Sequence, residues 1–118
     1  MERYGIIGGA VRPSICLGLG LGDWLTICTL ASDLTEDIKG QTRQIFTVFD
    51  GYLAEGGSDK TRFLTAQVWL KDMRDYDAFN IVWNEWIDPA HPPARSCISA
   101  NMANPNSLIE IRITAARD

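Results

Sequence analysis

Arg95 and Glu110 are the two charged residues whose positions are best suited to chemistry. Arg95 stands in the segment PARSCIS, and Glu110 interrupts the apolar run LIEIRITAA. An arginine presents a planar fork that can bind a carboxylate through two parallel hydrogen bonds, and a glutamate beside it can orient or activate a water molecule. Alternation alone favours the simpler interpretation, in which both side chains lie on solvated strand faces. Both interpretations stay open at this point.

The other reactive side chains do not form a catalytic set. The only histidine, His91, lies in the proline-rich loop DPAHPPA, and no nearby residues have metal-ligand spacing, so we expect no metal site. Cys16, Cys28 and Cys97 are an odd number of cysteines without a CxxC pair. This pattern predicts three buried thiols in a reducing compartment. The carboxylates are scattered over positions typical of helix caps and solvated surfaces, and no two of them form a convincing catalytic pair.

Length and composition predict one globular domain over residues 1–118. The chain has 46% hydrophobic and 22% charged residues and a net charge of -4. An acidic chain has no broad electrostatic attraction to nucleic acid or to anionic lipid, so nucleic acid is an unlikely partner. No run approaches the ~20 apolar residues of a membrane-spanning helix. The N-terminal segment lacks the basic start and apolar stretch of a secretory signal, so we expect a cytoplasmic protein.

A β-hairpin is expected in the first third of the chain, after a strand near residues 4–11. The segment ICLGLGLGDWLTICTLA alternates leucine with glycine, which places the leucines on one face and bare glycines on the other. Gly22 and Asp23 can form a two-residue turn that pairs Leu21 with Trp24. Another part of the protein must approach the glycine face closely. A nucleotide-binding loop is the alternative, but the GxGxxG spacing is missing.

The central region predicts two helices separated by a strand. Residues 35–55 carry a helical apolar stripe, with Thr35 as a plausible N-cap and Gly56 and Gly57 as a left-handed stop. Residues 62–70 alternate as a strand with both faces covered. Asp72 can cap a second helix that ends at Pro89. The aromatic side chains of this helix have core spacing, and they are Tyr76, Phe79, Trp83 and Trp86.

Two final strands, residues 95–102 and 108–115, flank the turn signal Asn104, Pro105, Asn106 and predict a second hairpin. The complete order predicts an α+β fold, a mixed six-stranded sheet with two helices on one face. In this hairpin Arg95 and Glu110 are about six residues apart along the ladder, roughly 20 Å. One chain would then not bring both side chains to one small substrate, so neighbouring subunits would have to supply them.

Residues 40–116 resemble the RidA/YjgF family, also called the endoribonuclease L-PSP family. The resemblance is carried by the helix that contains Gln41, by GGSDK, by WLKDM with Asn80 in the next helix, by PARSC, and by the terminal IEI. It implies a chorismate-mutase-like fold, assembled as a homotrimer with three ligand clefts between subunits. In active members of the family, these clefts hydrolyse reactive 2-imino or enamine acids to 2-keto acids and ammonia without a metal or organic cofactor.

The resemblance also assigns roles to individual residues. Arg95 matches the arginine that holds the substrate carboxylate, and Cys97 matches the neighbouring cysteine whose backbone lines the cleft. Glu110 matches the glutamate associated with the attacking water, and Asn80 matches a helix asparagine near the cleft. A protonated imine is already electrophilic, so such a site needs chiefly to orient the substrate and position a water molecule.

The N-terminal third differs from the family pattern at two places. The usual GPYSQA segment is replaced by RPSICLG, which lacks the tyrosine, and the SGQ segment is replaced by CTL. Cys28 and Thr29 therefore stand where serine and glycine are common. Glycine allows close approach of a ligand to the backbone, so Thr29 would narrow the cleft or change its preference. Cys28 is either a thiol that faces the site or a buried structural cysteine.

Deamination of imino or enamine acids is the leading functional hypothesis from the sequence. The main alternative is a non-catalytic trimer that binds a small carboxylate, such as a keto acid, through the same arginine; the missing tyrosine and the altered SGQ segment favour it. Ribonuclease or translation-inhibitor activity is attached to parts of the family, but the acidic charge and lack of a basic groove count against it. A chaperone-like interaction protein is the fourth hypothesis, and no particular residue supports it.

Overall fold

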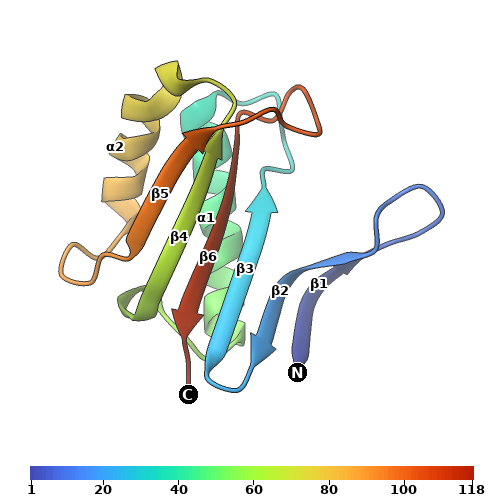
Figure 1. Ribbon diagram of the computed structural model, residues 1–118, viewed down its shortest axis with the longest axis vertical. Coiled ribbons are helices and arrows are strands. Elements are labelled where there is room, and N and C mark those ends of the chain that lie inside the picture. The colour runs from blue at the N-terminus through green and yellow to red at the C-terminus, as the bar shows by residue number, and fades with distance from the viewer.

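The computed structural model describes all 118 residues as one mixed sheet with two helices on the same face (Figure 1). The strand order across the six-stranded sheet is β1-β2-β3-β6-β4-β5. Two short 3₁₀ turns, Lys60–Arg62 and Met73–Asp75, precede β4 and α2. The elements are β1 (Glu2–Ile7), β2 (Ile15–Leu21), β3 (Trp24–Leu30), α1 (Ile38–Glu55), β4 (Phe63–Leu70), α2 (Tyr76–Trp86), β5 (Ala94–Ser99) and β6 (Ile109–Ala116). The α+β architecture predicted from the sequence is confirmed. No helix is long and apolar enough to cross a bilayer.

The predicted hairpin of β2 and β3 is confirmed, with Leu21 opposite Trp24 and Gly22 in the positive-φ conformation of the turn. Its glycine face is covered by residues of the same chain. The Tyr4 ring lies against Gly18, and the ion pair between Arg117 and Glu2 lies over Gly20. The glycines of β2 therefore serve close packing. β1 covers residues 2–7 in place of the expected 4–11.

The N-cap of helix α1 lies two residues after the expected one. Asp37, not Thr35, is the N-cap, and its carboxylate accepts a hydrogen bond from the Gly40 amide at 2.9 Å. Thr35 is turned away, because its hydroxyl donates to Asp33 at 2.6 Å. At the other end, Gly57 adopts the left-handed φ of 81°.

The beginning of β4 contains a bulge that the alternation in the sequence conceals. The pairing register with β6 shifts between Phe63 and Thr65. The shift places Phe63 in the core, 8% exposed, and turns Leu64 to the surface, 41% exposed. The bulge therefore separates Leu64 from Ala66, Val68 and Leu70, with which it shares the alternation in the sequence. An extra residue in one strand changes the face of every residue before it.

The predicted hairpin of β5 with β6 is wrong, because β4 lies between these strands. β4 pairs with β5 in parallel through the α2 crossover, and β4 pairs with β6 antiparallel. The turn at Asn104 forms as predicted, with the Ser107 amide donating to the Asn104 carbonyl at 3.1 Å. The loop that contains it crosses the end of β4, where the Ala100 amide donates to the Leu70 carbonyl at 2.9 Å.

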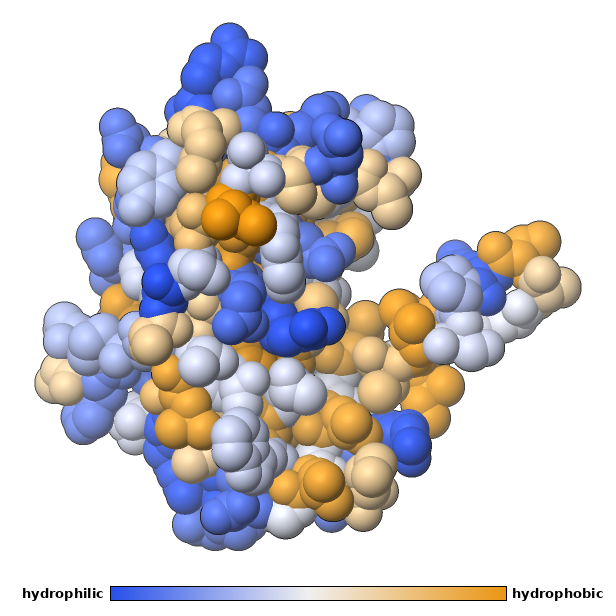
Figure 2. All heavy atoms as spheres, in the orientation of Figure 1, coloured by the Kyte–Doolittle hydropathy of each residue, from blue (hydrophilic) through white to orange (hydrophobic).

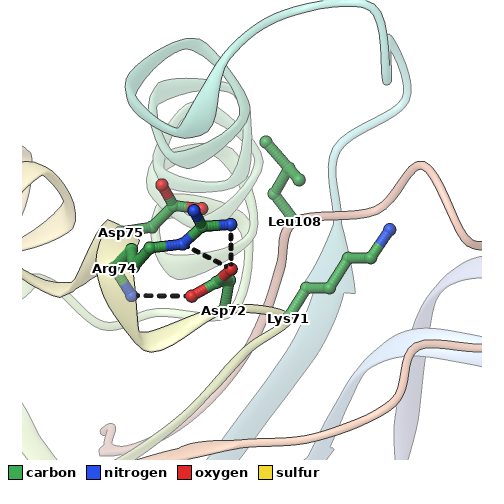
Figure 3. Close-up of a pocket in the computed structure, with 5 residues that line it drawn as sticks. All are labelled: Lys71, Asp72, Arg74, Asp75 and Leu108. Carbon is green, nitrogen blue, oxygen red and sulfur yellow. Dashed lines mark hydrogen bonds and ion pairs between the residues drawn. The ribbon is translucent and has the colours of Figure 1, made fainter.

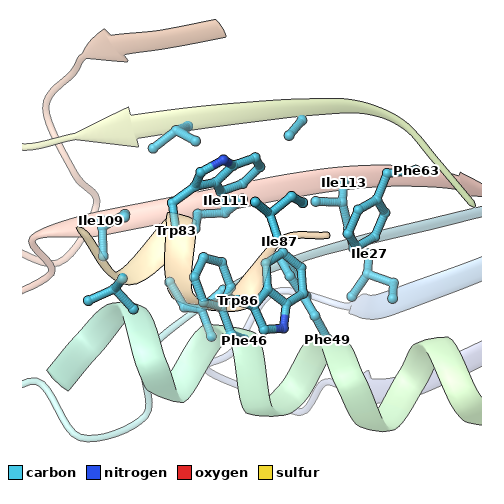
Figure 4. Packing of buried hydrophobic residues seen from close by; sticks show 14 of the residues in the cluster. Ile27, Phe46, Phe49, Phe63, Trp83, Trp86, Ile87, Ile109, Ile111 and Ile113 are labelled. Carbon is cyan, nitrogen blue, oxygen red and sulfur yellow. The ribbon is translucent and has the colours of Figure 1, made fainter. Parts of the chain in front are cut away.

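The core lies between the helices and one face of the sheet (Figure 4). Phe46 of α1 stacks on Trp86 of α2 with ring centroids 4.0 Å apart. The central strand β6 contributes three isoleucines that are at most 1% exposed, Ile109, Ile111 and Ile113. The predicted helix cap Asp72 caps the 3₁₀ turn before α2 by accepting from the Arg74 amide.

A buried glutamine ties the start of β6 to the N-terminal end of α1. The Gln41 side chain is 0% exposed, and its Oε1 accepts a hydrogen bond from the Leu108 amide at 3.0 Å. Its Nε2 lies within hydrogen-bonding distance of the carbonyls of Leu34, Glu36 and Asn106. Glu110 lies two residues beyond this attachment, so Gln41 fixes the strand end that presents it.

Replacement of Gln41 with leucine is expected to lower the free energy of unfolding by about 3 kcal/mol, because buried backbone groups lose their partners. Urea unfolding at one fixed protein concentration measures the change. Gln44→Leu is the matched control on the same helix, since Gln44 makes its hydrogen bonds to Asp33 in an exposed loop. Equal stability losses in the two variants would contradict the role assigned to Gln41.

Candidate functional site

Arg95 lies on the edge strand β5 with its side chain on the helix-covered face of the sheet. Its register partner is Ala66, a core residue that is 0% exposed. The guanidinium carbon lies 5.0 Å from the Trp83 ring centroid and 5.3 Å from that of Phe79. Arg95 Nη2 also donates to the Tyr76 hydroxyl at 3.3 Å. The helical spacing predicted Tyr76 to be a core residue. This prediction is wrong, because Tyr76 is an exposed side chain beside Arg95.

Cys97 and Asn80 lie on the same side of the molecule as Arg95. Cys97 follows two residues along β5, opposite the core residue Val68. Asn80 is one helical turn beyond Tyr76 on α2, and residues four apart share a helix face. The Asn80 Oδ1 atom is buried and has no hydrogen-bond partner within the chain. We call Arg95 and Cys97 of β5, together with Tyr76 and Asn80 of α2, the arginine edge.

Glu110 and Cys28 meet on the opposite, uncovered face of the sheet. In β6, Glu110 alternates with the buried residues Ile109 and Ile111 and therefore points away from the helices. Cys28 on the neighbouring strand β3 has the same orientation, and its thiol donates to Glu110 Oε2 at 3.9 Å. Thr29, the register partner of Ile111, belongs to the helix-covered face, and its hydroxyl donates to the Leu30 carbonyl. Cys28 thus lies beside Glu110 on the uncovered face and not in the helix-covered core.

Burial and charge keep both cysteines near the candidate site in their thiol form. Burial raises the pKa of Cys28, and the negative charge of Glu110 raises it further. Burial also raises the pKa of Cys97, while the positive charge of Arg95 opposes this rise. A thiol protonated at neutral pH can donate a hydrogen bond to a carboxylate and is a poor nucleophile. Cys28 is suited to orient Glu110 and not to attack a substrate.

The contact between Cys28 and Glu110 predicts the rate of thiol alkylation. Iodoacetamide should modify Cys28 slowly at pH 8, and Glu110→Gln should accelerate the reaction several-fold, because it removes the negative charge that raises the thiol pKa. Peptide mass spectrometry resolves the rate for each cysteine. Cys16 on β2 is the internal control and should react equally in both proteins. An unchanged Cys28 rate would show that the two side chains do not interact in solution.

Arg95 and Glu110 do not share a site within one subunit. Arg95 is opposite Ala66 and Glu110 is opposite Trp69, so they are three residues apart along the strands and separated by β4. Strand geometry gives a separation of about 14 Å, shorter than the 20 Å of the incorrect hairpin. The two side chains also project from opposite faces. One chain alone therefore presents two partial sites, the arginine edge and the Glu110–Cys28 pair.

A pocket opens beside the Glu110–Cys28 pair where β2 separates from β3. The ladder between these strands ends at Gly18 and Ile27, whereas β3 stays paired with β6 as far as Leu30 and Glu110. Beyond this fork, the arm formed by β1, β2 and their connecting loop extends away from the body of the protein (Figure 1), with a notch between arm and body (Figure 2). The pocket has a volume of about 270 Å³ and is lined by Cys16, Leu17, Gly18, Leu19, Thr26, Cys28 and Arg112.

A separate hollow of about 550 Å³ lies at the end of β4 (Figure 3). In it Arg74 pairs with Asp72 at 2.7 Å, and Lys71 donates to the Pro105 carbonyl. This hollow contains none of the candidate site residues predicted from the sequence. No group of three or more His, Cys, Asp and Glu side chains is arranged to hold a metal ion.

The family model described as endoribonuclease L-PSP matches residues 27–117. The chain belongs to this family. A RutC family protein from Haemophilus ducreyi is 45% identical over 85 residues, which are 72% of this chain and 73% of the relative. A protein named 3-aminoacrylate deaminase RutC, from Acinetobacter baylyi, is 32% identical over 67% of this chain and 62% of its own length. The family resemblance inferred from the sequence is confirmed.

Solved structures of the L-PSP family extend the likeness to the N-terminal arm. A YjgF-family protein from Neisseria meningitidis superposes with a TM-score of 0.86 at 32% identity, covering 99% of this chain and 94% of the other. A protein from Pseudomonas aeruginosa superposes with a TM-score of 0.88 at 30% identity, covering 99% and 98% of the two chains. The N-terminal third thus keeps the family fold although its sequence motifs differ.

Two residues beside these partial sites could not be singled out from the sequence. Tyr76 has the helical spacing of a core aromatic, and only its position at the first turn of α2 exposes it beside Arg95. Arg112 has the alternation of an ordinary solvent-facing residue. Its place at the fork depends on where β2 leaves β3, and no local pattern marks that point.

Proposed function

We propose that this chain forms a homotrimer that hydrolyses 2-imino or enamine acids to 2-keto acids and ammonia at clefts between subunits. The single observation that carries the proposal is the division of the candidate residues into two partial sites. Arg95, Cys97 and Asn80 lie on one edge, and Glu110 and Cys28 lie on the opposite face. A cleft that combines the arginine edge of one subunit with the Glu110 face of the next would hold one small substrate between them.

The uncovered face of the sheet supports assembly. It carries large apolar side chains that no part of the same chain covers, which are Ile15, Leu21, Trp24 and Ile98, between 47% and 58% exposed (Figure 2). The arm adds Val11, which is 97% exposed. Exposed apolar surface of this extent is typical of a protein–protein interface. A head-to-tail trimer would bury this face while joining unlike partial sites at each contact.

The proposed reaction divides its steps between the two partial sites. Arg95 holds the substrate carboxylate through its guanidinium fork. Glu110 accepts a proton from a water molecule as the water oxygen bonds to C2 of the protonated imine and the C=N π electrons move to nitrogen. Glu110 then returns this proton to the amino group of the carbinolamine. As the hydroxyl proton moves to Glu110 and the C–N bond breaks, ammonia leaves; it then takes this proton from Glu110 as ammonium, so the keto acid and the Glu110 carboxylate remain.

The named relative supports the class of substrate. The Acinetobacter baylyi relative is named as a deaminase of 3-aminoacrylate, which is itself an enamine acid. Three free thiols agree with the expected cytoplasmic location. The family is also named for an endoribonuclease, but the net charge of -4 does not favour binding to RNA.

The experiment that tests the proposal couples an amino-acid oxidase to this protein and follows the loss of the freshly formed imine together with ammonia release. Wild-type protein should accelerate both above the rate in buffer. Binding of keto acids without acceleration of any imine would select the non-catalytic binding protein. RNA cleavage that co-purifies with the protein and persists after contaminating nucleases are removed would overturn the argument from charge.

A further inference from the structure

We propose that the pocket at the fork of β2 and β3 is a subsite for a second carboxylate, held by Arg112. This inference rests on the proposed function and makes it more specific, because it names imino acids with an acidic side chain as the preferred substrates. The α-carboxylate of such a substrate would occupy the arginine edge of the neighbouring subunit. The acidic side chain of the substrate would extend past Glu110 into the pocket.

The geometry of β6 places Arg112 at a suitable distance from Glu110. The two residues are two apart on one strand, so they project from the same face about 7 Å from each other. Cys28 lies between them, since it is the register partner of Arg112 and its thiol is 3.9 Å from Glu110 Oε2. The positive charge of Arg112 opposes the rise in the pKa of Cys28, which agrees with this proximity.

Arg112 is an unpaired cation within its own subunit. The five ion pairs of the protein involve Arg43, Arg62, Arg74, His91 and Arg117, and Arg112 is in none of them. It is also the only charged residue among those that line the pocket, and no carboxylate competes for it there. An exposed guanidinium without an ion pair can form two parallel hydrogen bonds with a carboxylate.

The pocket offers suitable surroundings for a short carbon chain. Its walls are mostly apolar, because Leu17 and Leu19 line one side. The hydroxyl of Thr26 is already used, since it donates to the Ile113 carbonyl at 3.1 Å. In a five-carbon dicarboxylic acid, three carbon–carbon bonds separate C2 from the second carboxylate. The length of these three bonds and one hydrogen bond of about 2.9 Å together match the spacing of about 7 Å between Glu110 and Arg112 along β6.

The test measures binding of 2-oxoglutarate and 2-oxobutanoate, the keto-acid products with and without a second carboxylate, by calorimetry. Wild-type protein should bind 2-oxoglutarate about 10- to 100-fold more tightly, the effect of one bidentate charge-assisted contact. Arg112→Met should remove this preference without weakening 2-oxobutanoate. Arg43→Met is the matched control, because it removes an arginine from the distant surface of α1 and should keep the preference.

Each other outcome overturns the subsite. An Arg112→Met protein that keeps the preference shows that another group reads the second carboxylate. If Arg112→Met weakens the binding of both keto acids equally, Arg112 is a general carboxylate anchor. If Arg112→Met no longer forms a trimer, Arg112 is a contact between subunits. If wild-type protein binds 2-oxobutanoate but not 2-oxoglutarate, the subsite fails while the proposed function stands. If it binds neither keto acid and accelerates no imine, both fail.

Discussion

Arg95→Ala should reduce kcat/KM for imine hydrolysis by at least about 100-fold, because each hydrogen bond to a charged group contributes about 1.5–3 kcal/mol. Without the guanidinium fork, the substrate carboxylate has no bidentate partner at the arginine edge. Binding of 2-oxobutanoate should weaken in parallel, since the same contact holds substrate and product. Initial rates of ammonia release and calorimetry measure the two effects.

A structural explanation for such a loss has to be separated from a chemical one. The guanidinium of Arg95 packs against Tyr76, Phe79 and Trp83, so alanine removes packing together with charge. Arg95→Met keeps an unbranched side chain against these rings and should be as inactive as Arg95→Ala while remaining folded and trimeric. Arg95→Lys should be intermediate, because an ammonium group lacks the planar fork. Full activity in the methionine variant would contradict carboxylate binding by Arg95.

The sequence predicted those parts of the fold that depend on neighbouring residues. The turn at Gly22 and Asp23 determines the register of β2 with β3, because the two residues that flank a two-residue turn pair with each other and so fix every other pair. The apolar stripe of α1 likewise predicts its buried face, since helical periodicity is local. The Asn104 turn forms as expected even though the strands on either side of it do not pair.

The larger errors concern relations between distant segments, whereas the local ones shift an element end by a few residues. Alternation shows that residues 95–99 and 109–116 are strands, but it does not show that β4 lies between them. The bulge after Phe63 depends on the pairing of Phe63 with Ala115 of β6, and no pattern in the sequence of β4 marks it. For the candidate site, the sequence identified Arg95 and Glu110 as residue types suited to the chemistry. It could not show that they project from opposite faces, because this depends on the strand order.

Subunit complementation tests the proposal that each cleft uses two different chains. Arg95→Met and Glu110→Gln homotrimers should each be nearly inactive, since every cleft lacks either the carboxylate anchor or the group that accepts the water proton. The two variants are produced together with different affinity tags, and trimers that carry both tags are isolated. Every such trimer contains two copies of one variant and one copy of the other.

In a cyclic trimer of this composition, one of the three clefts combines an intact Arg95 from one chain with an intact Glu110 from the next. The mixed trimers should therefore recover about a third of the wild-type activity. Doubly tagged trimers of a single variant are the control and should stay inactive. If Arg95 and Glu110 instead acted within one chain, every cleft in the mixed trimer would lack one of them. Mixed trimers without activity, together with active wild-type trimers, would thus contradict a cleft shared between subunits.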